Sequence, residues 1–227
     1  MQGDDAEKKE RIGVFGGTFD PVHTGHIRLA EFVLAQRIVD RILYVPAAEP
    51  PHKPGAMASF SHRVAMLKIA IAGRAAMAVS TIESQRLVPS YTVDCLRALQ
   101  QEFPGTPLSF LLGADSLLEL HHWYRFTELF HLADLIVVAR SGLADNDCYI
   151  AIRKVAGDYI PDTAHRLWIR HDGAKIWYLT GFSSDVSSSS VRLQLASHQD
   201  PQGVDQAVIA HIQKHHLYQA GKNALHS

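Results

Sequence analysis

The stretch from Ile12 to His26, IGVFGGTFDPVHTGH, predicts a short buried strand, a glycine turn and the start of a helix. Gly16 and Gly17 let the backbone approach a ligand closely, because no Cβ stands in the way. His23 and His26 are three residues apart, so they share one face of the expected helix. Backbone amides, the positive end of a helix dipole and two imidazoles together suit a polyphosphate. This combination favours a phosphate site over a purely structural turn with two ordinary histidines.

A dinucleotide-binding fingerprint is excluded by details of the same region. The pattern G-x-G-x-x-G is absent, and the next apolar run ends as Leu43-Tyr44-Val45-Pro46 without an acidic residue placed to hold a ribose. The glycine turn therefore predicts a phosphate site of another kind.

Short apolar runs alternate with helical patterns along the rest of the chain, which predicts an α/β fold: a Rossmann-like, doubly wound parallel sheet flanked by helices. Strands are expected at residues 12–15, 41–45, 76–81, 108–112, 135–139 and 176–179. Helices are expected at residues 24–36, 61–72 with Ser61 as N-cap, 90–101, 116–120 and from about 187. Residues 1–10 are expected to be a disordered tail and 11–220 a single domain, with 141–175 elaborating the last crossover.

Polar motifs follow the expected strands at residues 16–26, 50–53, 113–115 and 187–192. Ligands of open parallel sheets bind at the carboxyl ends of the strands, near the point where the strand order reverses. We therefore expect these four loops to converge on one edge of the sheet.

The serine run before Arg192 is typical of a helix start, because serine side chains cap helix N-termini. Four serines together with a permanently charged, forked guanidinium favour a second phosphate cradle. Plain capping and a solvated surface arginine are the competing interpretation.

Composition limits the classes of function that remain. The chain has 227 residues, 47% of them hydrophobic and 20% charged, and a net charge of −1, which fits one soluble domain with a real core. Without a basic stripe, nucleic acid is not expected as a partner, and no apolar run reaches membrane-spanning length. Cys95 and Cys148 lack metal-site spacing and predict reduced thiols in the cytoplasm. The oligomeric state stays open, a homo-oligomer included.

The fourteen histidines show no spacing that is typical of zinc. The pairs His121-His122 and His215-His216 are expected at the surface or at helix ends. No metal site made of protein side chains is therefore predicted.

Five motifs in order carry a resemblance to a known family: GGTFDPVHTGH at 16–26, PPHK at 50–53, PSYT at 89–92, GADS at 113–116 with Trp123, and VSSSSVR at 186–192. Over residues 11–218 they resemble the bacterial nicotinate-mononucleotide adenylyltransferases of the nucleotidyltransferase superfamily. The resemblance implies transfer of AMP from ATP to nicotinate mononucleotide in NAD biosynthesis, which gives deamido-NAD and pyrophosphate. It also implies Mg²⁺ bound through the ATP phosphates.

The resemblance assigns roles to individual residues. It makes His23, His26 and Arg192 catalytic and places nicotinate mononucleotide against Lys53, Thr92 and Trp123. ATP is expected to contact Gly16, Gly17, Thr18, Phe19, His23, His26, Gly113, Asp115, Ser187, Ser188, Ser189 and Arg192. Ser189 stands where the family usually has Thr, and the serine keeps the hydroxyl group.

Three of these residues also fit purely structural roles. Asp115 could instead cap the helix 116–120, Trp123 could be a core residue, and Lys53 could be a solvated loop lysine.

Competing functions remain open at this point. The same superfamily signature occurs in enzymes that adenylylate pantetheine phosphate, although these are shorter and lack the PPHK and SYT segments. Class I aminoacyl-tRNA synthetases have a similar HxGH motif, but this chain is too short for such an enzyme and lacks its Lys-rich second signature. Nicotinamide mononucleotide as the substrate is also open, as is a nucleotide sensor without catalysis. A helix N-terminus at residues 90–92 supplies hydrogen-bond donors, which favours the carboxylate of nicotinate.

Overall fold

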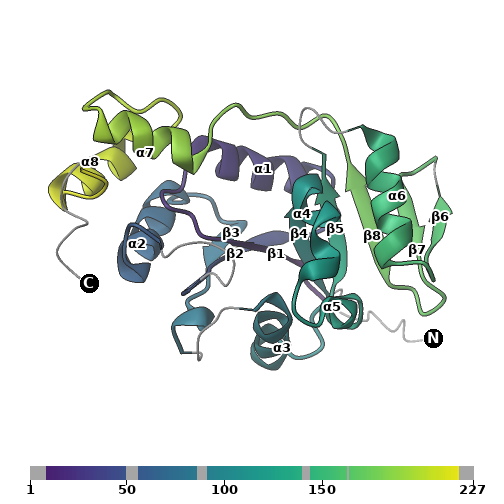
Figure 1. Cartoon of the computed structure of the whole chain (residues 1–227). Helices are drawn as coiled ribbons and strands as arrows, with labels where there is room; N and C mark the ends of the chain where they lie inside the picture. Colours follow the sequence, from purple (N-terminus) through teal and green to yellow (C-terminus); the bar gives the residue numbers. More distant parts are fainter. Residues whose placement is uncertain (1–8, 50–55, 86–90, 140–143, 163, 220–227) are drawn as a thin grey trace.

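The computed structural model describes residues 9–49, 56–85, 91–139, 144–162 and 164–219. Within them, eight strands form one sheet in the order β3-β2-β1-β4-β5-β8-β7-β6 (Figure 1). Neighbouring strands from β3 to β8 run parallel, whereas β7 is antiparallel to both β8 and β6. The strands are β1 (Ile12–Gly17), β2 (Arg41–Pro46), β3 (Met77–Val79), β4 (Leu108–Gly113), β5 (Asp134–Val138), β6 (Ile160–Asp162), β7 (Leu167–Ile169) and β8 (Lys175–Leu179).

Helices cover both faces of this sheet. They are α1 (Thr24–Ala35), α2 (Phe60–Ala70), α3 (Thr92–Glu102), α4 (Ala114–Leu118), α5 (Phe126–Leu132), α6 (Asp145–Val155), α7 (Ser188–Ala196) and α8 (Gln206–Lys214). Two short 3₁₀ turns, η1 (Ile82–Gln85) and η2 (Leu120–His122), join them. None of the helices in the described ranges is both long and apolar enough to cross a membrane.

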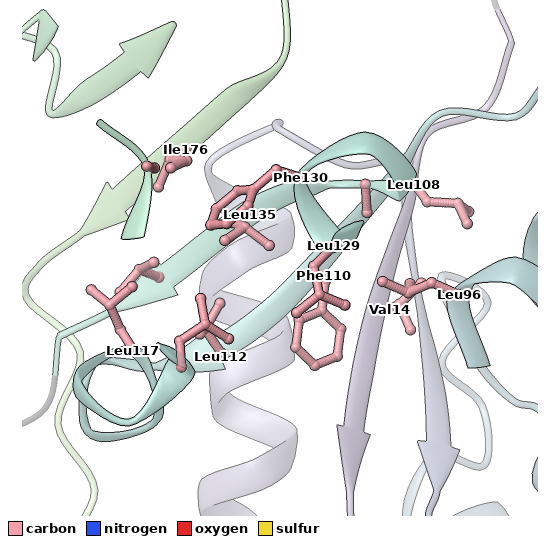
Figure 2. Packing of buried hydrophobic residues seen from close by; sticks show 14 of the residues in the cluster. Val14, Leu96, Leu108, Phe110, Leu112, Leu117, Leu129, Phe130, Leu135 and Ile176 are labelled. Atoms are coloured by element: carbon pink, nitrogen blue, oxygen red, sulfur yellow. The ribbon is translucent and has the colours of Figure 1, made fainter. Parts of the chain in front are cut away.

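The core is divided by the sheet into two buried clusters, because successive side chains of a strand point to opposite faces. Phe110 and Leu112 of β4 belong to the cluster under α3, α4, α5 and α6, which Figure 2 shows, whereas Leu111 belongs to the cluster under α1, α2, α7 and α8. Most positions of β1, β2, β4 and β5 are therefore buried, and these strands appear in the sequence as continuous apolar runs.

The strand order reverses between β1 and β4. From β1 the chain builds outward through β2 and β3, then returns to the other side of β1 with β4 and β5 (Figure 1). The loops that follow β1 and β4 diverge at this point, which is where ligands of doubly wound sheets bind. The predicted doubly wound α/β fold is thus confirmed, and the six expected strands lie within two residues of their predicted ends.

The sequence did not predict β6 and β7, which arise from the segment 141–175. Both are three residues long. β6 is the edge strand, where Ile160 is 72% exposed, so burial imposes no alternating pattern on it. β7 lies between β8 and β6, and its buried Leu167 and Trp168 form too short a run to show a period. One expected helix cap was wrong, because Ser59 rather than Ser61 caps α2. The alternative in which Asp115 caps the next helix is not observed, because Gly113 is the N-cap of α4.

Some predictions fall on residues outside the described ranges. They are the first eight residues of the expected disordered tail, the PPHK segment with Lys53, and Ser90 before α3.

Candidate active site

A cavity of about 510 Å³ opens at the carboxyl ends of β1 and β4, between the turn after β1 and the helices α3 and α4. Six residues that the sequence assigns to ligands line it: Gly16, Gly17, Thr18, Thr92, Asp115 and Trp123. Two of the four loops expected to converge, 16–26 and 113–115, therefore meet at this cavity, whereas 50–53 lies outside the described residues and 187–192 does not line the cavity.

One end of this cavity is aromatic. Trp123 is half-buried and packs edge-on against Phe110, with ring centroids 6.2 Å apart. Tyr91 and Tyr124 face each other at 4.5 Å on the cavity wall. Trp123 is therefore not an enclosed core residue, because its ring is available to a flat ligand. The two tyrosines were not singled out from the sequence, which gives no signal that distinguishes them from ordinary aromatic residues.

Hydrogen-bond donors lie at the same end. Helix α3 begins at Thr92, and its N-cap Tyr91 makes no capping bond with its side chain. The first amides of a helix have no partner within the helix, so the α3 N-terminus offers N–H groups beside the Thr92 hydroxyl. This end of the cavity therefore suits an acceptor-rich group such as a carboxylate.

Asp115 lies at the opening of the cavity, in the first turn of α4. Its side chain is exposed, and the backbone of Gly113 takes the N-cap position. The Asp115 carboxylate is therefore not the cap of α4, and it lines the cavity at the end of β4.

His23 and His26 lie outside this cavity, around the N-terminus of α1. Their rings are 3.8 Å apart and tilted by 32°, and the backbone N–H of His23 donates to Nδ1 of His26 at 3.2 Å. Because Nδ1 accepts this bond, the proton of a neutral His26 ring sits on Nε2, which becomes a hydrogen-bond donor. The pair is thus a donor site at a helix N-terminus, which favours anions.

Two glycines of the motif are required by close contacts. A Cβ on Gly25 would lie 2.5 Å from Ser184 Oγ and 2.9 Å from His23 Nδ1, so any side chain there would displace the catalytic-pair candidate. A Cβ on Gly17 would lie 3.0 Å from the Phe19 ring. The Phe19 side chain is itself buried, so only its backbone remains to contact a ligand.

Asp20 lies in the loop between β1 and α1, residues 18–23, which we call the motif loop. It fastens this loop to two distant parts of the chain. Its Oδ2 accepts from the Met57 N–H at 2.7 Å, and its Oδ1 accepts from the Ala58 N–H at 3.1 Å and from the Tyr218 hydroxyl at 2.6 Å. Burial, reinforced by the Asp20 carboxylate, raises the pKa of Tyr218 far above its ordinary value, so the phenol stays protonated and donates. Asp20 is therefore a positioning residue of the loop.

Arg63 on α2 also binds the motif loop. Its guanidinium donates to the carbonyls of Thr18 at 2.8 Å and of Ala48 and Ala58 at 3.2 Å each, and it is 1% exposed. Burial lowers the pKa of Arg63, an effect that the Asp20 carboxylate opposes. An arginine on the apolar face of a predicted helix is a signal in the sequence that could have indicated this contact; no comparable signal marks Tyr218.

Helix α7 brings the serine run against the motif. Ser187 caps the helix by accepting from the Ser190 N–H at 3.1 Å, as expected for a serine-rich start. Ser188 donates from its hydroxyl to the Pro21 carbonyl at 2.9 Å. The N-termini of α1 and α7 therefore lie beside the same loop, and their dipoles add there.

Arg192 is tied to this loop too. Its Nη1 donates to the Asp20 carbonyl at 2.6 Å and its Nη2 to Ser189 Oγ at 3.2 Å. It is therefore not a solvated surface arginine, although α7 lies outside the 510 Å³ cavity.

Comparison with known proteins identifies the family. A family model described as cytidylyltransferase-like matches residues 14–194. A protein of Trichlorobacter lovleyi named "Probable nicotinate-nucleotide adenylyltransferase" is 40% identical over 83% of this chain and 89% of its own. One of the same name from Gloeobacter violaceus is 40% identical over 92% and 96%.

A solved Plasmodium falciparum nicotinic acid mononucleotide adenylyltransferase complexed with NaAD has the same fold, with a TM-score of 0.71 at 20% identity over 92% of this chain and 97% of that one. The sequence identities to the bacterial proteins extend over almost the whole described domain. This chain belongs to the nicotinate-nucleotide adenylyltransferase family.

Proposed function

We propose that this protein transfers AMP from ATP to nicotinate mononucleotide and releases deamido-NAD and pyrophosphate. The observation that carries the proposal is the pairing of two different environments at one sheet edge. A donor-rich turn with two helix N-termini lies next to an aromatic cavity with a helix N-terminus at its far end. The names of the relatives support the same reaction. We also propose that residues 11–220 act as one nucleotidyltransferase domain, in the cytoplasm.

The reaction needs little covalent chemistry from the protein. A phosphate oxygen of the mononucleotide attacks the α-phosphorus of ATP, the bond to the β-phosphate oxygen breaks, and pyrophosphate leaves. The attacking oxygen is already ionised at neutral pH, so no general base is required. Catalysis then consists of holding both phosphates in line and stabilising the charge that develops.

His23 and His26 supply that stabilisation in our proposal. The Nε2 donor of His26, fixed by its bond from the His23 backbone, hydrogen-bonds a phosphate oxygen of ATP. The backbone of residues 16–19 separates the triphosphate from the phosphate of the second substrate. The start of α7, with Ser187, Ser188, Ser189 and Arg192, contacts the β- and γ-phosphates.

The nucleosides occupy the remaining elements of the site. Gly113 and Asp115 hold the ATP ribose, since a carboxylate accepts from both hydroxyls. Trp123 stacks on the pyridine ring, and Thr92 with the α3 amides binds its carboxylate. Lys53, which lies outside the described residues, is proposed to close over the phosphates.

Mg²⁺ is proposed to enter with ATP. The ion prefers oxygen ligands and keeps several waters, and the phosphates provide such oxygens. Among the described residues, no group of His, Cys, Asp and Glu side chains with ligand-like spacing lies at the motif. The donors there are imidazoles and amides, which fit the phosphate oxygens and leave the ion to the phosphates. When bound, the ion neutralises the charge of the leaving pyrophosphate.

The test is to incubate the protein with ATP, Mg²⁺ and either nicotinate mononucleotide, nicotinamide mononucleotide or pantetheine phosphate. We expect pyrophosphate release and a product with the mass of deamido-NAD from the first. A product from pantetheine phosphate alone would contradict the assignment. No pyrophosphate with any acceptor would instead support a nucleotide sensor.

A further inference from the structure

Three histidines from distant parts of the sequence meet where α2 packs against the C-terminal helix α8. His62 lies in the first turn of α2, His211 in the last turn of α8, and His215 is the C-cap residue of α8. Figure 1 shows the two helices side by side and apart from α3 and α4, and none of the three histidines lines the 510 Å³ cavity. One ring nitrogen of each histidine lies within 4.8 Å of the other two. The sequence predicted no metal site because His62 and His211 are 149 residues apart.

The nitrogen spacing fits a tetrahedral transition metal. Zinc–nitrogen bonds of about 2.0–2.1 Å place two ligand nitrogens roughly 3.3–3.4 Å apart in a tetrahedron. His62 Nδ1 and His211 Nε2 are 3.2 Å apart, which matches that edge. His215 is exposed, and its ligand nitrogen lies within 4.8 Å of the other two, which leaves its side chain room to adjust.

The backbone supports the same geometry. His211 and His215 are separated by one helical turn, and residues at i and i+4 share a helix face. This is the spacing with which helical histidine pairs bind zinc in metalloproteases. His62 approaches that pair from a second helix, with ring centroids 5.3 Å from His211 and 4.8 Å from His215.

We propose that His62, His211 and His215 form a binding site for a transition-metal ion that prefers imidazole, with Zn²⁺ as its occupant and water in the fourth position. Imidazole suits Zn²⁺, whereas Mg²⁺ prefers oxygen ligands. The site is thus separate from the Mg²⁺ that accompanies ATP, and it stands whether or not the proposed reaction is correct.

The position of the site gives it a structural role. Arg63, the next residue after His62, holds the Thr18 carbonyl, and Tyr218, three residues after His215, holds Asp20. A metal ion that joins α2 to α8 fastens the two segments from which both contacts come. It therefore stabilises the folded motif loop without touching a substrate.

The test is a Zn²⁺ titration of the full-length, tag-free protein against a competing chromophoric chelator, together with thermal melting. We expect one tight site per chain. The melting temperature should rise by roughly 5–10 °C at about a hundred times Kd, and Mg²⁺ should not replace Zn²⁺. His62→Gln and His215→Gln should each weaken binding on the order of 100-fold and remove the melting shift. His122→Gln, which alters an exposed histidine of η2, serves as the matched control and should change neither.

Melting of both variants without metal shows that they fold, so that lost binding reports the ligand itself. Anomalous X-ray scattering at the zinc edge then locates the ion. Density between α2 and α8 supports the proposal. Density at His23 and His26 instead, or unchanged Zn²⁺ affinity in His62→Gln and His215→Gln, would overturn it.

Discussion

The two ends of the candidate site are held in place in different ways. We call the motif loop the phosphate end and the cavity lined by Thr92 and Trp123 the pyridine end, after their proposed ligands. The motif loop at the phosphate end is fastened by hydrogen bonds from Arg63, Tyr218, Ser188 and Arg192, which belong to three segments far apart in the sequence. The cavity at the pyridine end is enclosed by packed aromatic and apolar side chains, with donors at one helix start.

The proposed function accounts for this difference. Stabilising charge in a transition state requires dipoles that are fixed before the reaction begins, and a loop gains such rigidity only from bonds to its surroundings. Recognising a flat ring requires shape and a few well-placed donors. We therefore expect changes at the phosphate end to lower turnover or stability, and changes at the pyridine end to alter which substrate is chosen.

The largest effect is expected at the phosphate end. His26→Ala should lower kcat by roughly 100-fold or more, because its Nε2 donor acts on charge that develops in the transition state. His23→Ala should behave similarly. Steady-state kinetics measures the loss, with His165→Ala at an exposed histidine as the control. If kcat were unchanged in both His26→Ala and His23→Ala, the two histidines would be parts of a turn without a catalytic role.

The second effect concerns the bonds that hold the loop. Tyr218→Phe removes the hydroxyl that donates to Asp20 and should lower the free energy of unfolding by about 1.5–3 kcal/mol, measured in urea. Tyr159→Phe is the matched control. Both tyrosines are 6% exposed, but the Tyr159 hydroxyl has no hydrogen-bond partner among the described residues. Equal losses in the two variants would show that the Asp20 bond does not fasten the loop.

The third effect separates the pyridine end from the phosphate end. Thr92→Val removes a donor at the start of α3 and should reduce the preference for nicotinate over nicotinamide mononucleotide by about tenfold in kcat/KM, through the acid substrate. Thr127→Val makes the same change in the first turn of α5, away from the cavity, and should leave the preference intact. An equal decrease in kcat/KM for both mononucleotides would indicate that Thr92 supports the fold and does not select the substrate.

The smallest effect tests the geometry of Arg192. Its guanidinium reaches Asp20 and Ser189 with two different nitrogens, which a lysine ammonium cannot reproduce. Arg192→Lys should raise the KM for ATP several-fold and that for the mononucleotide less, with Arg192→Ala more severe. Arg153→Lys, on the exposed side of α6, is the control. Equal changes in both KM values would indicate that α7 is only structural.

The same comparison explains what the sequence could predict. The buried parallel strands and the glycine turn are local patterns, so Ile12–Gly17 and the helix behind it were predicted correctly. The meeting of Gly16 and Asp115 at one cavity followed from their positions after predicted strands, whereas Thr92 was assigned through the family resemblance.

Contacts between distant segments left no such pattern. Tyr218 and Asp20 meet only through tertiary packing, and the histidines of α2 and α8 likewise, whereas Arg63 is marked in the sequence only by its place on the apolar face of a predicted helix. Edge strands such as β6, with little burial, also lack a periodic signal. Local periodicity therefore predicted the sheet and the positions of the loops, whereas the bonds that fasten them required the structure.

The most direct test of the proposed function compares the two pyridine mononucleotides with the wild-type protein, ATP and Mg²⁺. In the proposed complex, donors at the α3 N-terminus pair with both oxygens of the nicotinate carboxylate, whereas a carboxamide turns its NH₂ toward one of them. The buried mismatch costs on the order of 1–3 kcal/mol. We predict kcat/KM for nicotinate mononucleotide to exceed that for nicotinamide mononucleotide by roughly tenfold or more. Equal values, or a preference for the amide, would contradict the assignment of the cavity.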